Sequence, residues 1–254
     1  MTVRLSAMTL GHVTIPTAIL LEGREGNTTV PVTSYLIEHP CGRAVFDTGM
    51  SPAIQDSDDP AGHVGDLLAA LHVFDYTVGE DLAARLRALD VDPGSIDHVI
   101  NSHLHFDHCG GNAQVPNAEI VLQGREVTAA DEGGELRGYI DADYDTGQPR
   151  RLVDGEHDLF GDGSVVLFPT YGHTPGHQSA RVRTDAGEFV LCGDACYLQE
   201  SLETLTLPGV IADPESAMAS LECFRALQAA GSTIMFGHDL DFWATVPQAP
   251  ARLG

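Results

Sequence analysis

Short apolar runs separated by turn residues dominate the first part of the chain. The run Val30 to Glu38 is rich in β-branched and aromatic residues and is predicted to form a strand. Arg43 to Asp47 is predicted to pair with it, because Pro40-Cys41-Gly42 supplies the turn between them. The acidic stretch from Ser51 to Thr77 shows no clear period, so a long irregular loop is expected there.

A period of three to four residues then predicts helices. Leucines share one face of residues 78–89, and a shorter helix is expected over residues 123–132. Asp213-Pro214-Glu215 combines a capping side chain, a proline and an acid in the first turn, which predicts a helix that stops at Gly231. Further strands are expected over residues 96–101, 164–168, 179–183, 188–192 and 232–236.

Strands followed by helices, in two successive blocks, favour an α/β sandwich of two sheets with helices outside. The 254 residues are 43% hydrophobic and show no repeats, so a single domain over residues 1–254 is expected. The net charge of -24 repels phosphate groups, so neither nucleic acid nor an anionic membrane is an expected partner.

The basic residues and the cysteines exclude further classes. All 13 basic residues are arginines, which excludes enzymes that need a Schiff-base or phosphate-loop lysine. The five cysteines are scattered and odd in number, as is typical of a reducing compartment. Neither a signal peptide nor an apolar stretch of membrane-spanning length is recognised, so a cytoplasmic location is expected.

The candidate chemistry is concentrated in one short motif. His103, His105, Asp107 and His108 fall within six residues that follow a predicted strand. Neutral imidazole and carboxylate groups are the ligands of zinc and similar divalent ions. These four residues form two slightly offset pairs of ligands, which suit two metal ions better than one. The alternative, a cluster of hydrogen-bonded histidines, is disfavoured because three histidines and an aspartate lie so close together.

Further candidate ligands follow other predicted strands, each near a glycine. They are His173 and His177, Asp194 in Cys192-Gly193-Asp194, and His238 after Gly237. Glycine permits unusual backbone angles and close approach, which suits a loop that carries a ligand. Spacing alone does not choose between His173 and His177.

The motif H-x-H-x-D-H, followed in order by the three single-ligand motifs, resembles the metallo-β-lactamase superfamily from about Val30 to Asp239. Asp47-Thr48-Gly49 also matches an early aspartate motif of that superfamily. The resemblance implies an αββα sandwich of two mixed β-sheets flanked by helices, with the metal site along one edge. Asp47 would orient ligands by hydrogen bonds, or else be an ordinary turn aspartate.

The resemblance also implies how the ligands are shared between two divalent ions, with zinc as the expected metal. His173 is then preferred to His177, and the cysteines near the site are expected to be small buried residues. The first ion would be held by His103, His105 and His173, the second by Asp107, His108 and His238, and Asp194 would bridge both.

Local sequence narrows the resemblance to N-acyl homoserine lactonases. In Asp194-Ala195-Cys196-Tyr197, Tyr197 matches a tyrosine that contacts the substrate carbonyl in those enzymes, and Phe106 matches a residue of the pocket wall. Ordinary packing is the alternative role for both residues. The resemblance implies quorum quenching by hydrolysis of the lactone ester bond.

The implied chemistry follows from two adjacent ions. They would lower the pKa of a bridging water, so that a hydroxide attacks the lactone carbonyl near neutral pH. Tyr197 would stabilise the developing oxyanion, and Asp107 would pass a proton to the leaving alkoxide.

Other functions remain open at this point. The same site could open another lactone, such as 4-pyridoxolactone, or cleave a thioester as glyoxalase II does. A metal-binding scaffold or sensor is the alternative outside enzymes, but all seven ligand positions are filled and Asp107 is retained. The expected partner is a small-molecule lactone, and a homodimer is compatible with the resemblance. The acyl-chain preference is not predicted.

Overall fold

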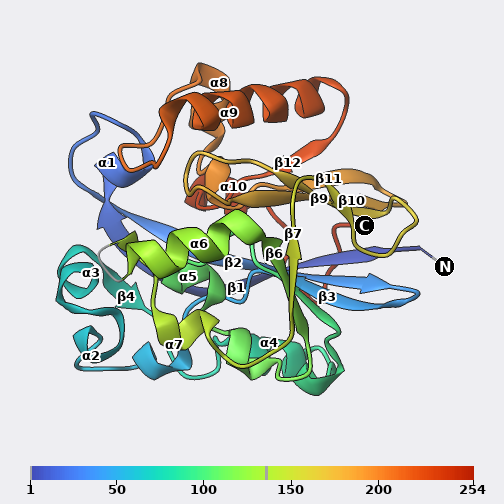
Figure 1. Ribbon diagram of the computed structural model, residues 1–254, viewed down its shortest axis with the longest axis horizontal. Helices are drawn as coiled ribbons and strands as arrows, with labels where there is room; N and C mark the ends of the chain where they lie inside the picture. Colours follow the sequence, from blue (N-terminus) through green and yellow to red (C-terminus); the bar gives the residue numbers. More distant parts are fainter. Residues whose placement is uncertain (1, 135–136) are drawn as a thin grey trace.

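Two β-sheets packed face to face form the centre of the computed structural model, which describes residues 2–134 and 137–254 (Figure 1). The first sheet has the strand order β4-β1-β2-β3-β5-β6-β7. Its first four strands are antiparallel neighbours, and from β3 to β7 the strands are parallel. The strands are β1 (Arg4–Pro16), β2 (Asn27–His39), β3 (Gly42–Phe46), β4 (Val73–Asp75), β5 (His98–Ile100), β6 (Glu119–Gln123) and β7 (Arg150–Val153).

The second sheet has the order β12-β11-β10-β9-β8. Only β11 and β12 are parallel neighbours, and the other pairs are antiparallel. β9 and β11 therefore run in the same direction, since both are antiparallel to β10. The strands are β8 (His157–Asp158), β9 (Val165–Pro169), β10 (Gln178–Thr184), β11 (Gly187–Leu191) and β12 (Thr233–Met235).

Helices cover the outer faces of both sheets (Figure 1). The long helix α9 lies over the second sheet, while α4 and α6 lie on the side of the first. The α-helices are α1 (Thr17–Leu20), α2 (Ala61–Val64), α3 (Asp66–Leu71), α4 (Leu82–Ala88), α5 (Phe106–Cys109), α6 (Gly124–Gly133), α7 (Asp141–Tyr144), α8 (Gln199–Thr204), α9 (Pro214–Ala229) and α10 (Leu240–Trp243). Short 3-10 turns are η1 (Pro52–Ile54), η2 (Pro93–Ser95), η3 (Asn112–Gln114) and η5 (Gly193–Ala195).

Three layers of buried apolar side chains hold this arrangement together. The middle layer joins the two sheets, with Phe46 of β3 and Leu167 of β9 in one cluster. One outer layer packs Leu82 and Leu86 of α4 with the first sheet, and the other packs Phe224 of α9 with the second. Full burial of such a side chain stabilises the fold by about 1.5–3 kcal/mol. The αββα sandwich expected from the sequence is therefore confirmed.

Most predicted elements are present, with ends that shift by a few residues. Asp213 caps α9 as predicted, because its side chain accepts a hydrogen bond from the Glu215 N–H. The loop expected over residues 51–77 is wrong in part, since it contains α2, α3 and β4. These elements are short and depend on packing, for example of Val64 and Leu68, which are 1% and 8% exposed.

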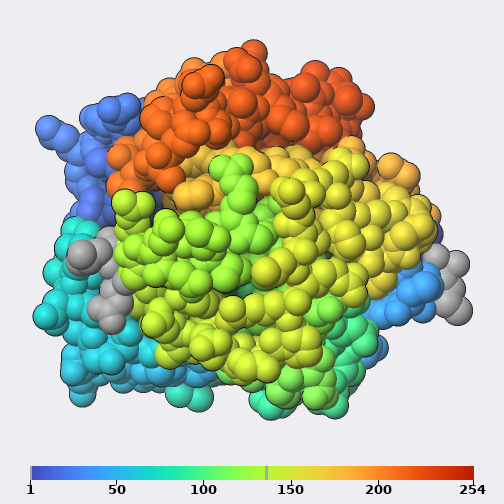
Figure 2. Space-filling model, viewed as in Figure 1, coloured from blue at the N-terminus to red at the C-terminus, as the bar shows by residue number. Residues whose placement is uncertain are grey.

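Figure 2 shows that the middle of the chain, in green and yellow, covers much of one face, with the orange and red C-terminal part above it. The last residues return to the first sheet, where the Leu253 N–H donates to the Leu5 carbonyl. No helix in the described ranges 2–134 and 137–254 is both long and apolar enough to cross a lipid bilayer.

Candidate metal centre

The candidate ligands are carried by segments that follow the carboxyl ends of strands. The motif that starts at His103 follows β5 of the first sheet. His173, Asp194 and His238 follow β9, β11 and β12 of the second. Because these three strands run in the same direction, their ends meet at one edge of that sheet. The site is therefore assembled at an edge shared by both sheets.

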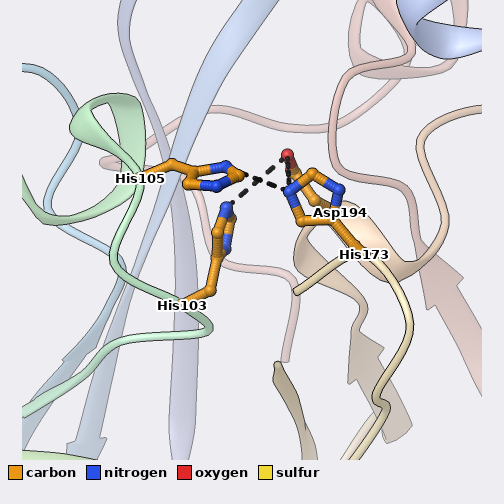
Figure 3. A group of neighbouring side chains, drawn as sticks. All are labelled: His103, His105, His173 and Asp194. Atoms are coloured by element: carbon orange, nitrogen blue, oxygen red, sulfur yellow. Dashed lines mark hydrogen bonds and ion pairs between the residues drawn. The ribbon is translucent and has the colours of Figure 1, made fainter. Parts of the chain in front are cut away.

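Four side chains form the first ligand group, and Figure 3 shows them pointing toward a common centre. His173 Nε2 lies 3.1 Å from His105 Nδ1 and 3.3 Å from Asp194 Oδ2. His103 Nε2 lies 3.8 Å from the same Asp194 oxygen. The group matches the set predicted for the first ion together with the predicted bridging aspartate.

Asp107, His108 and His238 form the second group. His108 Nε2 and His238 Nε2 lie 3.6 Å and 3.7 Å from Asp107 Oδ2. The same two nitrogens lie 3.0 Å and 3.1 Å from Asp194 Oδ1. Asp194 therefore turns one oxygen toward each group. The structure brings all seven predicted residues together, and their role as ligands stays a prediction.

The spacing of these atoms fits divalent cations. Zinc bonds of about 2.0–2.1 Å at tetrahedral angles place two ligand atoms about 3.3 Å apart, within the range found here. His103 Nε2, His108 Nε2 and Asp194 Oδ1 are buried and form no hydrogen bond. Buried polar atoms without a hydrogen bond are costly, and these three face the two ligand groups: His103 Nε2 the first, His108 Nε2 and Asp194 Oδ1 the second. Both groups therefore fit a bound cation.

Hydrogen bonds made by Nδ1, on the side of each ring away from the site, orient the Nε2 atoms of His108 and His238. His108 Nδ1 lies 2.9 Å from Asp47 Oδ2, and His238 Nδ1 lies 2.8 Å from the Pro31 carbonyl. A carboxylate and a carbonyl only accept hydrogen bonds, so both Nδ1 atoms donate. In its neutral form each ring then presents an Nε2 lone pair to the site, which is the tautomer that a metal ligand needs.

The orienting hydrogen bonds expected of Asp47 are present in the structure. It is 2% exposed, and the Ser102 N–H and hydroxyl donate to its two oxygens at 2.7 Å and 2.8 Å. Because the Ser102 hydroxyl gives its proton to Asp47, it accepts from His103 Nδ1 at 2.9 Å. One aspartate thus fixes the imidazoles of His108 and His103, the second of them through Ser102.

The electrostatics of the two groups differ. Burial and neighbouring imidazoles lower the pKa of His103 well below its usual value, and burial lowers the pKa of His105 to about 4. Burial opposes protonation of His108 as well, but Asp194, Asp107 and Asp47 raise its pKa overall. The first group therefore offers neutral imidazoles, while carboxylates favour positive charge in the second.

His177 lies outside both ligand groups. Its Nε2 accepts from the Asp194 N–H at 3.1 Å, and its Nδ1 lies 2.9 Å from Thr170 Oγ1. Gly193 shows why glycine precedes the aspartate: its φ is +54°, and a Cβ there would lie 2.9 Å from His177 Nε2. His177 thus holds the backbone of Asp194.

An apolar cavity of about 280 Å³ opens over both groups. Its floor includes Asp107, Asp194 and Tyr197, and Phe106 forms part of the wall. The Tyr197 hydroxyl lies 3.2 Å from His173 Nδ1. Burial and the nearby carboxylates raise the pKa of Tyr197 well above its usual value, so the phenol keeps its proton. The remaining apolar wall comes from β1, α1, β2, α3 and Val210.

The cysteines near the site are structural, as expected. Cys109, Cys192 and Cys196 are at most 1% exposed and belong to the hydrophobic clusters. All five cysteines of the chain are free thiols. They supply no member of the two ligand groups found among the described residues.

Sequence comparison agrees with the geometry. A family model of the Metallo-beta-lactamase superfamily matches residues 27–238 of the chain. The chain therefore belongs to the metallo-β-lactamase superfamily, the class that the sandwich and the paired ligand groups define.

Within that superfamily, individual relatives resemble most of the chain. The N-acyl homoserine lactonase AttM of Azorhizobium caulinodans is 34% identical over 243 residues, which cover 90% of this chain and 89% of the relative. The N-acyl homoserine lactonase AiiA of Bacillus thuringiensis subsp. kurstaki is 30% identical, with 84% and 82% covered. A solved N-acyl homoserine lactone hydrolase, with the product N-hexanoyl-L-homoserine at its catalytic metal centre, superposes with a TM-score of 0.90 at 27% identity and covers both chains fully.

Some supporting residues were not predicted from the sequence. Ser102 directly precedes the histidine motif, so its position is a signal that could have been used. Tyr139, whose ring centroid lies 5.0 Å from that of His105, and Glu126, which accepts from the Leu104 N–H, carry no such signal. Both lie far from the motifs in sequence and reach the site only through the fold.

Proposed function

We propose that this chain is a dinuclear metal-dependent hydrolase that opens the lactone ring of N-acyl homoserine lactones. The observation that carries the proposal is the cavity whose floor combines both ligand groups and whose wall is apolar. A lactone ring with an apolar tail needs these two surfaces in contact. The named relatives at 34% and 30% identity support the same substrate class.

Two divalent ions, with zinc as the proposed metal, would be held by the two groups and share Asp194. When bound, they would activate water as a nucleophile and polarise the ester carbonyl. Nitrogen and carboxylate oxygen donors without thiolate suit zinc, although other divalent ions accept the same set. Metal analysis of protein purified without chelator should give close to two ions per chain, and protein without metal would contradict this assignment.

Asp107 is proposed to move the proton. Its side chain is 18% exposed against 5% for Asp194, so it reaches the open cavity from the first turn of α5. A carboxyl group in this place can take a proton from the nucleophile and give it to the leaving alkoxide. Ring opening then yields a hydroxy acid with its proton balance complete.

Tyr197 is proposed to donate to the carbonyl oxygen as negative charge develops on it. With His173 Nε2 facing the first group, His173 Nδ1 carries the proton and donates to the Tyr197 oxygen. The phenol proton is then free to point toward substrate. Phe106 is proposed to pack against the substrate, because it is a wall residue of the same cavity.

The test is acid release, followed with a pH indicator, from a panel of substrates. The panel holds N-hexanoyl homoserine lactone, 4-pyridoxolactone, a glutathione thioester and a phosphodiester, each with and without chelator. Turnover of the homoserine lactone, its loss with chelator and its return with added zinc are expected. Faster turnover of another member would replace the proposed substrate class.

Two variants test the proposed roles. Asp107→Asn should lower kcat by about 10²–10⁴-fold. Tyr197→Phe should lower it by about 10–100-fold, which is the loss of one hydrogen bond to a charged oxygen. Metal content is measured on the same samples, because Asp107 is also a candidate ligand. An unchanged rate in Tyr197→Phe would remove that residue from the mechanism.

A further inference from the structure

Glu126 of α6 is a carboxylate with no exposed surface, and four donors surround it. Its Oε1 accepts from the Leu104 N–H at 3.1 Å and from the Tyr139 hydroxyl at 3.2 Å. Its Oε2 accepts from the Thr174 hydroxyl at 2.7 Å and from the Gly176 N–H at 3.0 Å. Within residues 2–134 and 137–254, no arginine or histidine lies within ion-pair distance of it.

The arrangement requires a carboxylate. Each oxygen faces one backbone N–H, and a backbone N–H can only donate. A glutamine would turn its NH2 group toward one of these two N–H groups, whichever way the amide is flipped. A carboxyl group accepts on both oxygens, so glutamate meets both N–H groups and glutamine does not. The four donated hydrogen bonds favour its ionised form, whereas burial raises the pKa of Glu126 above its usual value.

The four donors belong to the supports of the first ligand group. Leu104 lies between His103 and His105, and Thr174 follows His173 directly. The Tyr139 ring is tilted by 58° against the His105 ring, and the two residues form an isolated β-bridge. The contact is close, since a Cβ on Gly176 would lie 2.2 Å from the Glu126 backbone nitrogen.

The second ligand group has different supports. His108 is held by Asp47, and His238 by the Pro31 carbonyl. None of the four hydrogen bonds to Glu126 reaches these segments. Glu126 thus supports the first group alone, whereas Asp47 contacts His108 of the second group and reaches His103 of the first through Ser102.

We propose that Glu126 is a positioning residue for the first ligand group, joining the loop of His103 and His105 to the loop of His173 at the spacing that binds one divalent cation. The inference rests on the proposed metal ligation. It deepens that proposal by assigning the first ion a buried support, Glu126, that the second ion does not share.

The test measures zinc affinity in two backgrounds that each leave one group intact. His238→Ala weakens the second group, and His173→Ala weakens the first. Competition with a chromophoric chelator gives the dissociation constant of the zinc that remains. Glu126→Gln should weaken zinc binding by about 10- to 100-fold in the His238→Ala background. It should change zinc affinity by less than about twofold in the His173→Ala background. Asp47→Asn should instead weaken zinc binding in both backgrounds, because Asp47 contacts His108 directly and holds His103 through Ser102.

Matched variants separate positioning from general stability. Asp143→Asn alters another buried carboxylate, which accepts from His63 at 2.9 Å, and should lower thermal stability without changing zinc affinity. Tyr139→Phe and Thr174→Val each remove one donor to Glu126. Both should give smaller losses of zinc affinity in the His238→Ala background. They replace Glu126→Gln in the test if that variant does not fold.

If Glu126→Gln weakened zinc binding equally in the two backgrounds, or in neither, the proposal would be overturned. The readout is zinc binding alone, without lactone turnover. A chain that binds zinc as described but opens no homoserine lactone would therefore refute the proposed function and leave the role of Glu126 standing.

Discussion

Lengthening the acyl chain of the lactone should raise kcat/KM in two phases, because the cavity wall changes along its length. Val13, Val30 and Leu68 are 2%, 3% and 8% exposed and form its deep part. Leu71 and Val210, at 41% and 59% exposed, stand at its mouth. The first methylene groups of the substrate therefore contact buried side chains, and the later ones contact side chains that are partly exposed to water.

The magnitude follows from the free energy of burial. A fully buried methylene contributes about 0.8 kcal/mol, which is roughly fourfold in kcat/KM. At the mouth about half of that remains, or roughly twofold per methylene. Most of the gain should appear in KM, because the chain is remote from the reacting carbonyl and is held equally in ground and transition states.

The assay is acid release from a series running from the butanoyl to the dodecanoyl lactone. Leu71→Ala should lower kcat/KM by about two- to fourfold for long chains and leave the butanoyl lactone unchanged. Leu240→Ala is the matched control, since Leu240 is also 41% exposed but lies outside the cavity wall. A kcat/KM independent of chain length, or equal effects of the two variants, would refute the reasoning.

Three further predictions concern stability. Gly193→Ala should cost about 2–4 kcal/mol of unfolding free energy in a denaturant titration, because the left-handed backbone and the contact with Ser102 both resist a Cβ. Phe224→Ala, at a fully buried position, should cost about 3–5 kcal/mol in the same titration, and a loss below 1 kcal/mol would contradict the packing described. The hydrogen bond to Asp143 raises the pKa of His63, so its stabilisation is present below the unfolded pKa and is lost as pH rises through the folded one. His63→Gln should therefore destabilise by up to about 1 kcal/mol at pH 6 and by less at pH 9, and an equal loss at both would exclude the charged pair.

The sequence predicts elements whose pattern is long or whose caps are local. α9 is predicted from its capping aspartate, its proline and the glycine after it, and all of these act within a few residues. β1 was not predicted, although it is 13 residues long. Its register against β2 shifts between Thr9 and His12, and Gly11 lies at that irregularity, so the alternation of buried positions is broken.

The candidate site divides in the same way. The seven candidate ligands lie in short motifs with fixed spacing, so sequence alone could group them. The partners of Glu126 lie 22 residues before it at Leu104 and 48 residues after it at Thr174. Those distances carry no period, and the requirement for a carboxylate becomes visible only when both loops are folded against α6.

Each ligand group takes side chains from both sheets: His103, His105, Asp107 and His108 follow β5, whereas His173, Asp194 and His238 follow strands of the other sheet. A cation that binds either group therefore cross-links the two halves of the sandwich at their shared edge. Stability is then coupled to the free concentration of the ion, since an ion that binds only the folded chain stabilises it by mass action. A shortage of the metal would therefore lower the stability of the whole fold. The ions proposed to act in the reaction would also hold the two sheets together.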